Sequence, residues 1–214
     1  AWNNYHGGDG MDNAIDPNND NIVYGFTQFG GSLNISSDAG QTIGRVFPPR
    51  DDENDPISGN WITPLAISSE GEVYAGFDGV YQLQGNSWEK ISNTFGSVDP
   101  NDSYVQLEDL LVDPTNPDII YAAEGTFVYQ SKDRGQTFNA FFNADYQITD
   151  IAIDTYPGIT RPAQVIEDRL VFTLAVPYKR CQNHNAAIIR QVLDGIHNLL
   201  HRLHGNLPSA PGTV

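Results

Sequence analysis

Short apolar runs alternate with turn residues along roughly the first 150 residues of this chain. Residues 21–25, 72–76 and 118–122 read NIVYG, EVYAG and DIIYA, which are β-branched and aromatic runs that end in small residues. Each is followed by a segment of alternating apolar and polar residues, at 31–36, 79–83 and 126–131. Because the side chains of a strand point alternately to its two faces, these segments predict buried central strands, each followed by a half-buried strand.

A third kind of segment precedes each central strand. Residues 8–17, 107–114 and 148–154 align with one another, and residues 61–68 form a degenerate copy. Taking Ile15, Ile67, Val112 and Ile153 as equivalent gives spacings of 52, 45 and 41 residues. Spacings of about 40 to 50 residues are typical of four-stranded propeller blades. The sequence therefore predicts an all-β chain with blades at about 8–46, 60–95 and 105–143, and a fourth that starts near 147.

Two loops share one pattern, S-x-D-x-G-x-T followed by a bulky apolar residue. Aspartate two residues before glycine favours a turn, because the carboxylate binds nearby backbone N–H groups and glycine accepts positive φ. The matching positions are Ser36, Asp38, Gly40 and Thr42 in one loop, and Ser131, Asp133, Gly135 and Thr137 in the other. The middle repeat has lost the pattern, but its Trp88 stands where Ile43 and Phe138 stand.

These two loops resemble the Asp-box, or BNR, repeat of β-propellers such as sialidases, sortilin-like receptors and xyloglucanase-like glycosidases. The resemblance implies a hairpin loop on the outer part of a blade. The box residues are therefore expected to hold the fold rather than to do chemistry.

Charge divides the chain near residue 160. The formal net charge is −16, with 24 acidic and 5 basic residues in 1–160 but 3 acidic and 6 basic residues in 161–214. An acidic surface repels phosphate backbones, so nucleic acid is not an expected partner. The sequence has no apolar run of about 18 residues, so no membrane span is expected. By resemblance, an acidic, Lys-poor propeller is typical of secreted and cell-surface proteins.

The last 54 residues depart from the repeat. Residues 169–176 predict a strand, and the apolar spacing over 186–204 predicts an amphipathic helix. We treat 1–160 as propeller blades and 161–214 as a divergent segment. Because three and a fraction blades leave apolar flanks uncovered, the chain is expected to belong to something larger, either a longer protein or a complex whose other chain covers the flanks.

Aspartates of the inner-strand segments are the candidate chemical groups. Asp12, Asp109 and Asp150 occupy equivalent positions and predict an acidic arc along the inner strands. Paired carboxylates are what glycoside hydrolysis requires. Resemblance to xyloglucanase-like propellers implies Asp9 as a catalytic candidate, together with Asp12. The alternative is that these carboxylates satisfy backbone N–H groups at blade turns.

Further candidate ligand-binding residues are Trp2, Tyr5 and His6, which precede the glycine-rich segment 7–10. Trp61 and Trp88 are also aromatic, but their positions predict structural roles. No metal site or cofactor is expected. Calcium is considered for residues 16–20 and for the acidic loop 51–55, although residue 21 is Asn where a calcium loop of the EF-hand type requires Gly.

Three functions follow from these patterns. The leading one is a secreted or cell-surface propeller module that binds a glycan or a protein. The second is a glycoside hydrolase of the xyloglucanase-like propeller type, with Asp9 and Asp12 in its cleft. The third is a structural subunit of an extracellular assembly.

Overall fold

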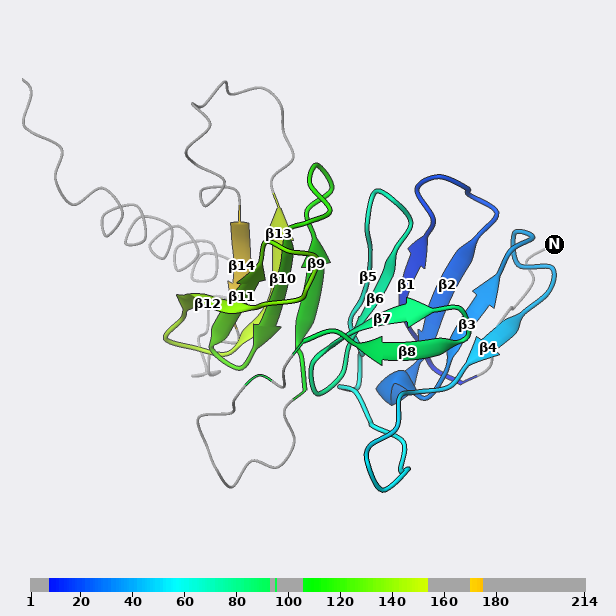
Figure 1. The fold of residues 1–214 in the computed structure, drawn as a ribbon, viewed down its shortest axis with the longest axis horizontal. Helices are drawn as coiled ribbons and strands as arrows, with labels where there is room; N and C mark the ends of the chain where they lie inside the picture. Colours follow the sequence, from blue (N-terminus) through cyan, green and yellow to red (C-terminus); the bar gives the residue numbers. More distant parts are fainter. Residues whose placement is uncertain (1–7, 93–94, 96–105, 154–169, 175–214) are drawn as a thin grey trace, which may run out of the picture. The chain divides into compact units, whose positions relative to one another are not determined.

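A computed structural model describes residues 8–92, 95, 106–153 and 170–174 of the 214-residue chain. Its regular structure is almost entirely β, in three four-stranded sheets and one strand pair (Figure 1). The first sheet contains β1 (Gly10–Ile15), β2 (Val23–Thr27), β3 (Leu33–Ser36) and β4 (Gly44–Val46), with the short 3-10 turn η1 (Gln28–Gly30) after β2. The second contains β5 (Leu65–Ile67), β6 (Val73–Gly76), β7 (Val80–Gln84) and β8 (Ser87–Lys90). The third contains β9 (Asp109–Val112), β10 (Ile120–Glu124), β11 (Phe127–Ser131) and β12 (Asn139–Asn143), and β13 (Ile148–Ile153) pairs with β14 (Leu170–Leu174).

Each four-stranded sheet is an antiparallel meander in which strands adjacent in the sequence are also adjacent in the sheet. This is the blade of a β-propeller, so the predicted fold class is confirmed. The helix predicted over 186–204 lies outside the described residues. Within the described part of the chain, no helix is long and apolar enough to cross a membrane.

Strand alternation lets one sheet bury both of its faces. In β6, Val73 and Ala75 belong to the apolar core shared with the first sheet, whereas Tyr74 between them belongs to the core shared with the third sheet. Because successive side chains point to opposite faces, a short apolar strand supplies two cores at once.

The same rule holds at the next sheet. In β10, Ile120 and Ala122 face the second sheet, and Tyr121 faces the core that also contains Ile148 and Ile151 of β13. Three inter-sheet cores therefore follow one another along the chain. The second-strand tyrosine of each blade points to the following blade.

Asn34 departs from this pattern. It pairs with Gly25 in the same register in which Tyr81 pairs with Ala75 and Tyr129 with Ala122. Its side chain is fully buried, and neither amide atom has a hydrogen-bond partner in the described part of the chain. A buried polar group left without a partner costs about 1–3 kcal/mol.

Replacing Asn34 with a side chain of similar size and no polar atoms should stabilise the protein. We expect Asn34→Leu to raise the free energy of unfolding by about 1 kcal/mol, because the desolvation cost of the amide disappears. Urea denaturation followed by circular dichroism measures this change. The control is Asn139→Leu, at an exposed amide on β12, for which no gain is expected. A loss of stability in Asn34→Leu would show that the amide makes a compensating interaction.

Candidate functional site

One side of the sheets collects the segments that enter the inner strands. Gly10 at the start of β1 pairs with Thr27 at the end of β2, so the turn after β2 lies beside the start of β1. We call this side the entry edge and define it by residues 8–9, 28–31, 58–63, 106–108 and 147. Loops at one edge of a propeller are free to vary without disturbing the blades, so they are natural positions for function.

Two aromatic rings stand together on the entry edge. The rings of Phe29 and Trp61 meet edge to face, with centroids 4.9 Å apart, and they are 45% and 48% exposed. Ile62, beside them in the sequence, is 55% exposed. Exposed apolar side chains gathered in one place are more informative than single ones, because they indicate a contact surface.

The backbone holds Phe29 in an uncommon conformation. Its φ is 59°, in the left-handed region that non-glycine residues rarely adopt. The Phe29 N–H donates to the Trp61 carbonyl at 3.2 Å, and its carbonyl accepts from the Gly59 N–H at 3.0 Å. Gly30 follows at φ 65°, where a Cβ would lie 2.6 Å from the Phe77 ring. Backbone strain of this kind is concentrated at functional sites.

Amide and carboxylate side chains flank the aromatic pair. The Gln28 Oε1 accepts from the backbone N–H of Asp9 at 3.2 Å. On the other side, Asn60 Nδ2 donates to Glu108 Oε2 at 2.7 Å, and the other oxygen of Glu108 accepts from Gln147. The entry edge therefore presents two exposed rings with hydrogen-bonding side chains near them. These side chains belong to segments next to strands of all three sheets and of β13.

Two of the predicted inner-strand aspartates bridge neighbouring sheets. One oxygen of Asp12 accepts from its neighbour Asn13 N–H at 2.9 Å, and the other from Leu65 N–H in β5 at 2.9 Å. Asp109 repeats this arrangement.

Asp109 accepts from Leu110 N–H at 2.8 Å and from Ile151 N–H in β13 at 2.7 Å. At the equivalent position of the second sheet stands Pro64, which has no carboxylate. Only the first and third sheets therefore make this bridge toward the next inner strand.

Burial changes the acidity of both bridging carboxyls. Burial raises the pKa of Asp12, against the lowering effect of its two backbone hydrogen bonds. For Asp109, burial is again the main cause, and the neighbouring carboxyl of Asp150 adds to it, raising the pKa to about 7. Asp150 itself is exposed on β13. The structure thus brings Asp109 and Asp150 together, as a carboxyl pair on adjacent inner strands.

The other predicted site residues lie apart or outside the described residues. Asp9 is exposed at the entry edge, before β1. Trp2, Tyr5 and His6 lie outside the described residues. The sequence prediction missed Phe29 and treated Trp61 as structural, because the two rings are 32 positions apart. The signal that would have indicated them is the pair Phe29–Gly30, a bulky residue before a glycine in a tight connection between two strands.

The two S-x-D-x-G-x-T loops have the same hydrogen bonds. In the first, Ser36 Oγ accepts from Gly40 N–H at 2.8 Å, and Asp38 accepts from the Thr42 N–H at 2.8 Å and its hydroxyl at 2.7 Å. The bonds from Thr42 are the main cause that lowers the pKa of Asp38 to about 2.

The second loop makes the equivalent bonds. Ser131 Oγ accepts from Gly135 N–H at 2.8 Å, and Asp133 accepts from the Thr137 N–H at 2.8 Å and from its hydroxyl at 2.7 Å. Bonds from Thr137 lower the pKa of Asp133 in the same way. Each loop connects the third and fourth strands of its sheet. Its Asp carboxylate accepts hydrogen bonds from residues of the same loop.

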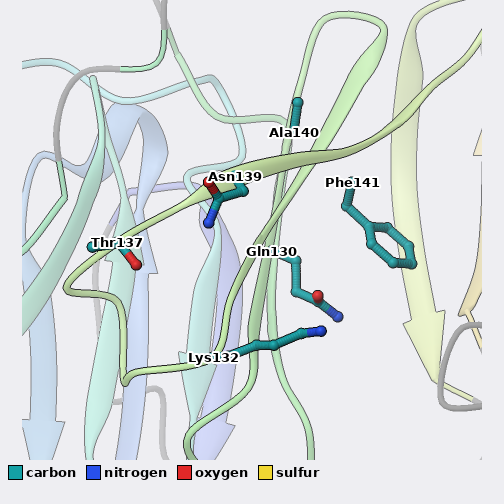
Figure 2. A pocket seen from close by; sticks show the side chains of 6 residues that line it. All are labelled: Gln130, Lys132, Thr137, Asn139, Ala140 and Phe141. Carbon is teal, nitrogen blue, oxygen red and sulfur yellow. The ribbon is translucent and has the colours of Figure 1, made fainter. Parts of the chain in front are cut away.

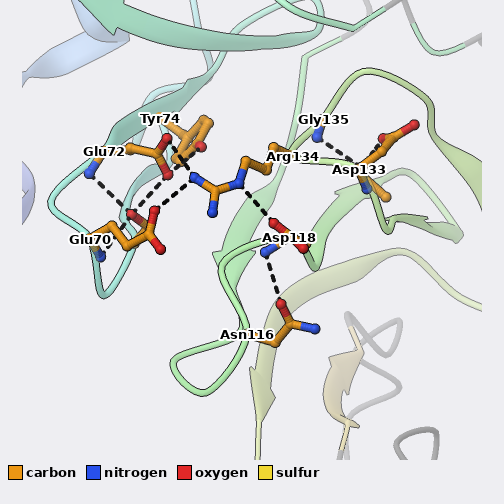
Figure 3. A network of polar contacts seen from close by, with 10 residues as sticks. Glu70, Glu72, Tyr74, Asn116, Asp118, Asp133, Arg134 and Gly135 are labelled. Atoms are coloured by element: carbon orange, nitrogen blue, oxygen red, sulfur yellow. Dashed lines mark hydrogen bonds and ion pairs between the residues drawn. The ribbon is translucent and has the colours of Figure 1, made fainter.

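Arg134 extends the second loop to the neighbouring sheet. Figure 3 shows its guanidinium between carboxylates from two connections. It bonds Asp118 at 2.7 Å, before β10, and Glu70 and Glu72 at 2.8 and 3.1 Å, in the turn before β6. Exposed ion pairs contribute little singly, but three carboxylates on one guanidinium fix its geometry. This network joins the second and third sheets.

A small hollow lies on the outer part of the third sheet. Gln130, Lys132, Thr137, Asn139, Ala140 and Phe141 line it, and its volume is about 190 Å³ (Figure 2). Ligand pockets usually measure about 300–1,000 Å³. This hollow is therefore smaller than a usual ligand pocket.

The two segments considered for calcium form internally bonded turns. Asp16 Oδ1 accepts from Asn18 N–H at 2.8 Å, and Asp51 Oδ1 accepts from Asp55 N–H at 2.7 Å. Among the described residues, no group of three or more His, Cys, Asp or Glu side chains is arranged to hold a metal ion.

Comparisons with known proteins support the fold. No protein-family model matches the sequence, and no curated protein matches it. The GH74 xyloglucanase from Xanthomonas campestris is similar in structure, with 16% identity and a TM-score of 0.55 over 76% of this chain and 26% of that chain. The GH74 enzyme of Niastella koreensis has 19% identity and a TM-score of 0.52 over 67% of this chain and 24% of that chain. U3-55K has 14% identity and a TM-score of 0.52 over 68% of this chain and 43% of that chain.

At these identities the likeness shows a β-propeller fold and nothing about activity. The chain spans about a quarter of the length of the two GH74 proteins and less than half of U3-55K.

The raised pKa of Asp109 predicts a pH-dependent stability. The ordinary value is 3.8 and the folded value is about 7, so folding favours the protonated carboxyl. Below about pH 3 the carboxyl is protonated in both states and costs nothing. As pH rises from about 4 to about 7, the unfolded state ionises first and native stability falls.

Relative to Asp109→Asn, which does not ionise, the wild-type protein should lose on the order of 4 kcal/mol over this range and little more above it. Urea denaturation at a series of pH values measures the difference. The control is Asp145→Asn, an exposed acid between β12 and β13, whose curve should run parallel to the wild type. A parallel curve for Asp109→Asn would contradict the raised pKa.

Proposed function

We propose that this chain forms part of a secreted or cell-surface β-propeller of the Asp-box type, and that it binds a glycan on the entry edge. The observation that carries the proposal is the exposed ring pair of Phe29 and Trp61. The two box loops, which make equivalent hydrogen bonds, support a propeller of the Asp-box type. The acidic composition supports a secreted or cell-surface location.

A pyranose ring suits the chemistry of this edge. Its C–H groups form an apolar face that stacks on an aromatic ring, while the hydroxyls around its rim need donors and acceptors. Phe29 and Trp61 supply the apolar faces, and polar atoms come from Asn60, next to Trp61 in the sequence, and from Glu108 before β9. Binding sites combine apolar surface with a few fixed polar groups in this way.

The geometry favours a glycan over a protein partner at this position. Protein interfaces have a large apolar centre that is depleted of charge. Here the exposed apolar set is small, namely Phe29, Trp61 and Ile62, and carboxylates and amides stand beside it.

Substitution of the rings tests the proposal. Binding of xyloglucan oligosaccharides and cello-oligosaccharides is measured by isothermal titration calorimetry on the whole chain. We expect Trp61→Ala and Phe29→Ala each to weaken binding about tenfold, which corresponds to about 1.4 kcal/mol of lost stacking.

Ile15→Ala is the control, because Ile15 is also an exposed apolar residue but lies at the end of β1 opposite to Gly10, away from the entry edge. Unchanged affinity in both ring variants, or no affinity of the wild type for any of these sugars, would count against a glycan site here.

The Asp109–Asp150 pair favours a second function, glycoside hydrolysis. Glycoside hydrolysis uses a carboxyl with a raised pKa as general acid together with a second carboxylate. Asp109 has the raised pKa that a general acid needs, although both of its oxygens accept backbone N–H groups.

Hydrolysis is tested by the release of reducing ends from xyloglucan. Under this second function we expect turnover by the wild type and its loss in Asp109→Asn and in Asp150→Ala. Glycan binding without turnover would leave the chain as a binding module.

A further inference from the structure

The connection 58–63, which leads into β5, carries Trp61 outside any strand. On one side its backbone is bonded to Phe29, whose N–H donates to the Trp61 carbonyl at 3.2 Å and whose carbonyl accepts from the Gly59 N–H at 3.0 Å. These two bonds bring the backbones of the two ring residues together. The Trp61 N–H has a different partner, which is a side chain.

Asn60 uses both ends of its side-chain amide. Its Oδ1 accepts from the Trp61 N–H at 2.7 Å, and its Nδ2 donates at 2.7 Å to Glu108 Oε2, in the segment before β9. The reverse orientation of the amide would put two donors together on one side and two acceptors together on the other, so the partners fix the orientation. Asn60 therefore connects the backbone of Trp61 to a carboxylate 48 positions further along the chain.

Glu108 also receives a second amide. Its Oε1 accepts from Gln147 Nε2, just before β13, while its Oε2 accepts from Asn60. A carboxylate has only acceptors, so one side chain can receive both donors. Hydrogen bonds to an ionised acceptor are roughly twice as strong as those between neutral groups. A series of three side chains, Asn60, Glu108 and Gln147, therefore runs from the Trp61 backbone to the start of β13.

Packing fixes the backbone from which the Asn60 side chain projects. Thr63 is fully buried, and its hydroxyl donates to the Asn60 carbonyl at 2.9 Å. A Cβ at Gly59 would overlap the Thr63 side chain, so the connection has little room for another path. The Asn60 amide is therefore presented to Glu108 from a backbone that is already in place.

We propose that Asn60 is a positioning residue, which holds Trp61 beside Phe29 by connecting the Trp61 N–H to Glu108. Its importance for binding rests on the function proposed above, in which the ring pair binds the glycan. A binding group that is fixed in its bound position loses less conformational entropy when the ligand arrives. Rings on loops need such support more than rings on strands, because strands are the more rigid elements.

Exchanging the donor and acceptor roles tests this connection. In Asn60→Asp the Trp61 N–H keeps an acceptor, but a second carboxylate replaces the donor that faces Glu108, and like charges repel. Glu108→Gln alone is a milder change, because its one side-chain oxygen can accept from only one of the two amides. In the combined variant, the amide introduced at 108 donates to the carboxylate introduced at 60 and still accepts from Gln147. All three hydrogen bonds and the net charge are then kept.

Nuclear magnetic resonance of the whole chain, without sugar, reports the ring contact. The signal is the nuclear Overhauser effect between the ring protons of Trp61 and Phe29, assigned by its absence in Trp61→Ala. We expect this effect to weaken in Glu108→Gln, to be lost in Asn60→Asp and to return in the combined variant. Affinity for cello-oligosaccharides should follow the same order, with a loss of about tenfold in Asn60→Asp.

Asn86→Asp is the matched control, because it makes the same exchange at an exposed amide in the turn between β7 and β8, where neither readout should change. Circular dichroism verifies that each variant is folded. A ring contact that persists in Asn60→Asp, or one that the combined variant does not restore, would overturn the proposal. A contact that is lost and restored without any change in affinity would support the positioning by Asn60 and count against the glycan site. The two proposals can therefore fail separately.

Discussion

The alternation of side chains along short strands is the constraint on which this structure depends. A four-residue strand such as β6 contributes to two different cores, because Val73 and Ala75 point to one neighbour and Tyr74 points to the other. A single blade therefore cannot bury its own apolar surface. Stability is shared between blades, as in other repeat architectures, and each blade depends on both of its neighbours.

The sequence indicates this architecture well because blades obey local rules. The spacing of Ile15, Ile67, Val112 and Ile153 reflects one strand position repeated, and the structure places these residues at the ends of the four inner strands. Trp88, alone after a degenerate loop, stacks on Phe26 of the first sheet at 5.9 Å. An apolar anchor can persist where the polar loop has changed, since packing needs volume whereas the loop needs particular donors and acceptors.

Less of the candidate site than of the fold could be predicted from the sequence. The equivalence of Asp12, Asp109 and Asp150 suggested an acidic arc, but it did not reveal that two of these carboxylates accept N–H groups from the next inner strand. That contact joins residues 53 and 42 positions apart. The pairing of Phe29 with Trp61 is likewise a product of how two loops meet. Periodicity identifies which face a residue occupies, but it does not identify its neighbour from another blade.

The second and third sheets show how one kind of contact replaces another. Pro64 stands where a bridging aspartate would be, so no carboxylate from the second sheet reaches the Leu110 N–H, which bonds to Asp109 instead. At the same interface, Arg134 carries ion pairs to Glu70 and Glu72.

At the interface of the first and second sheets, the corresponding turn of the second sheet, between β7 and β8, has no arginine, and the Asp12 bridge is present instead. Both interfaces keep a full apolar core. The polar contacts therefore fix the relative position of neighbouring blades, and one kind can replace another. The free energy that holds the blades together comes from burial of the apolar surface between them.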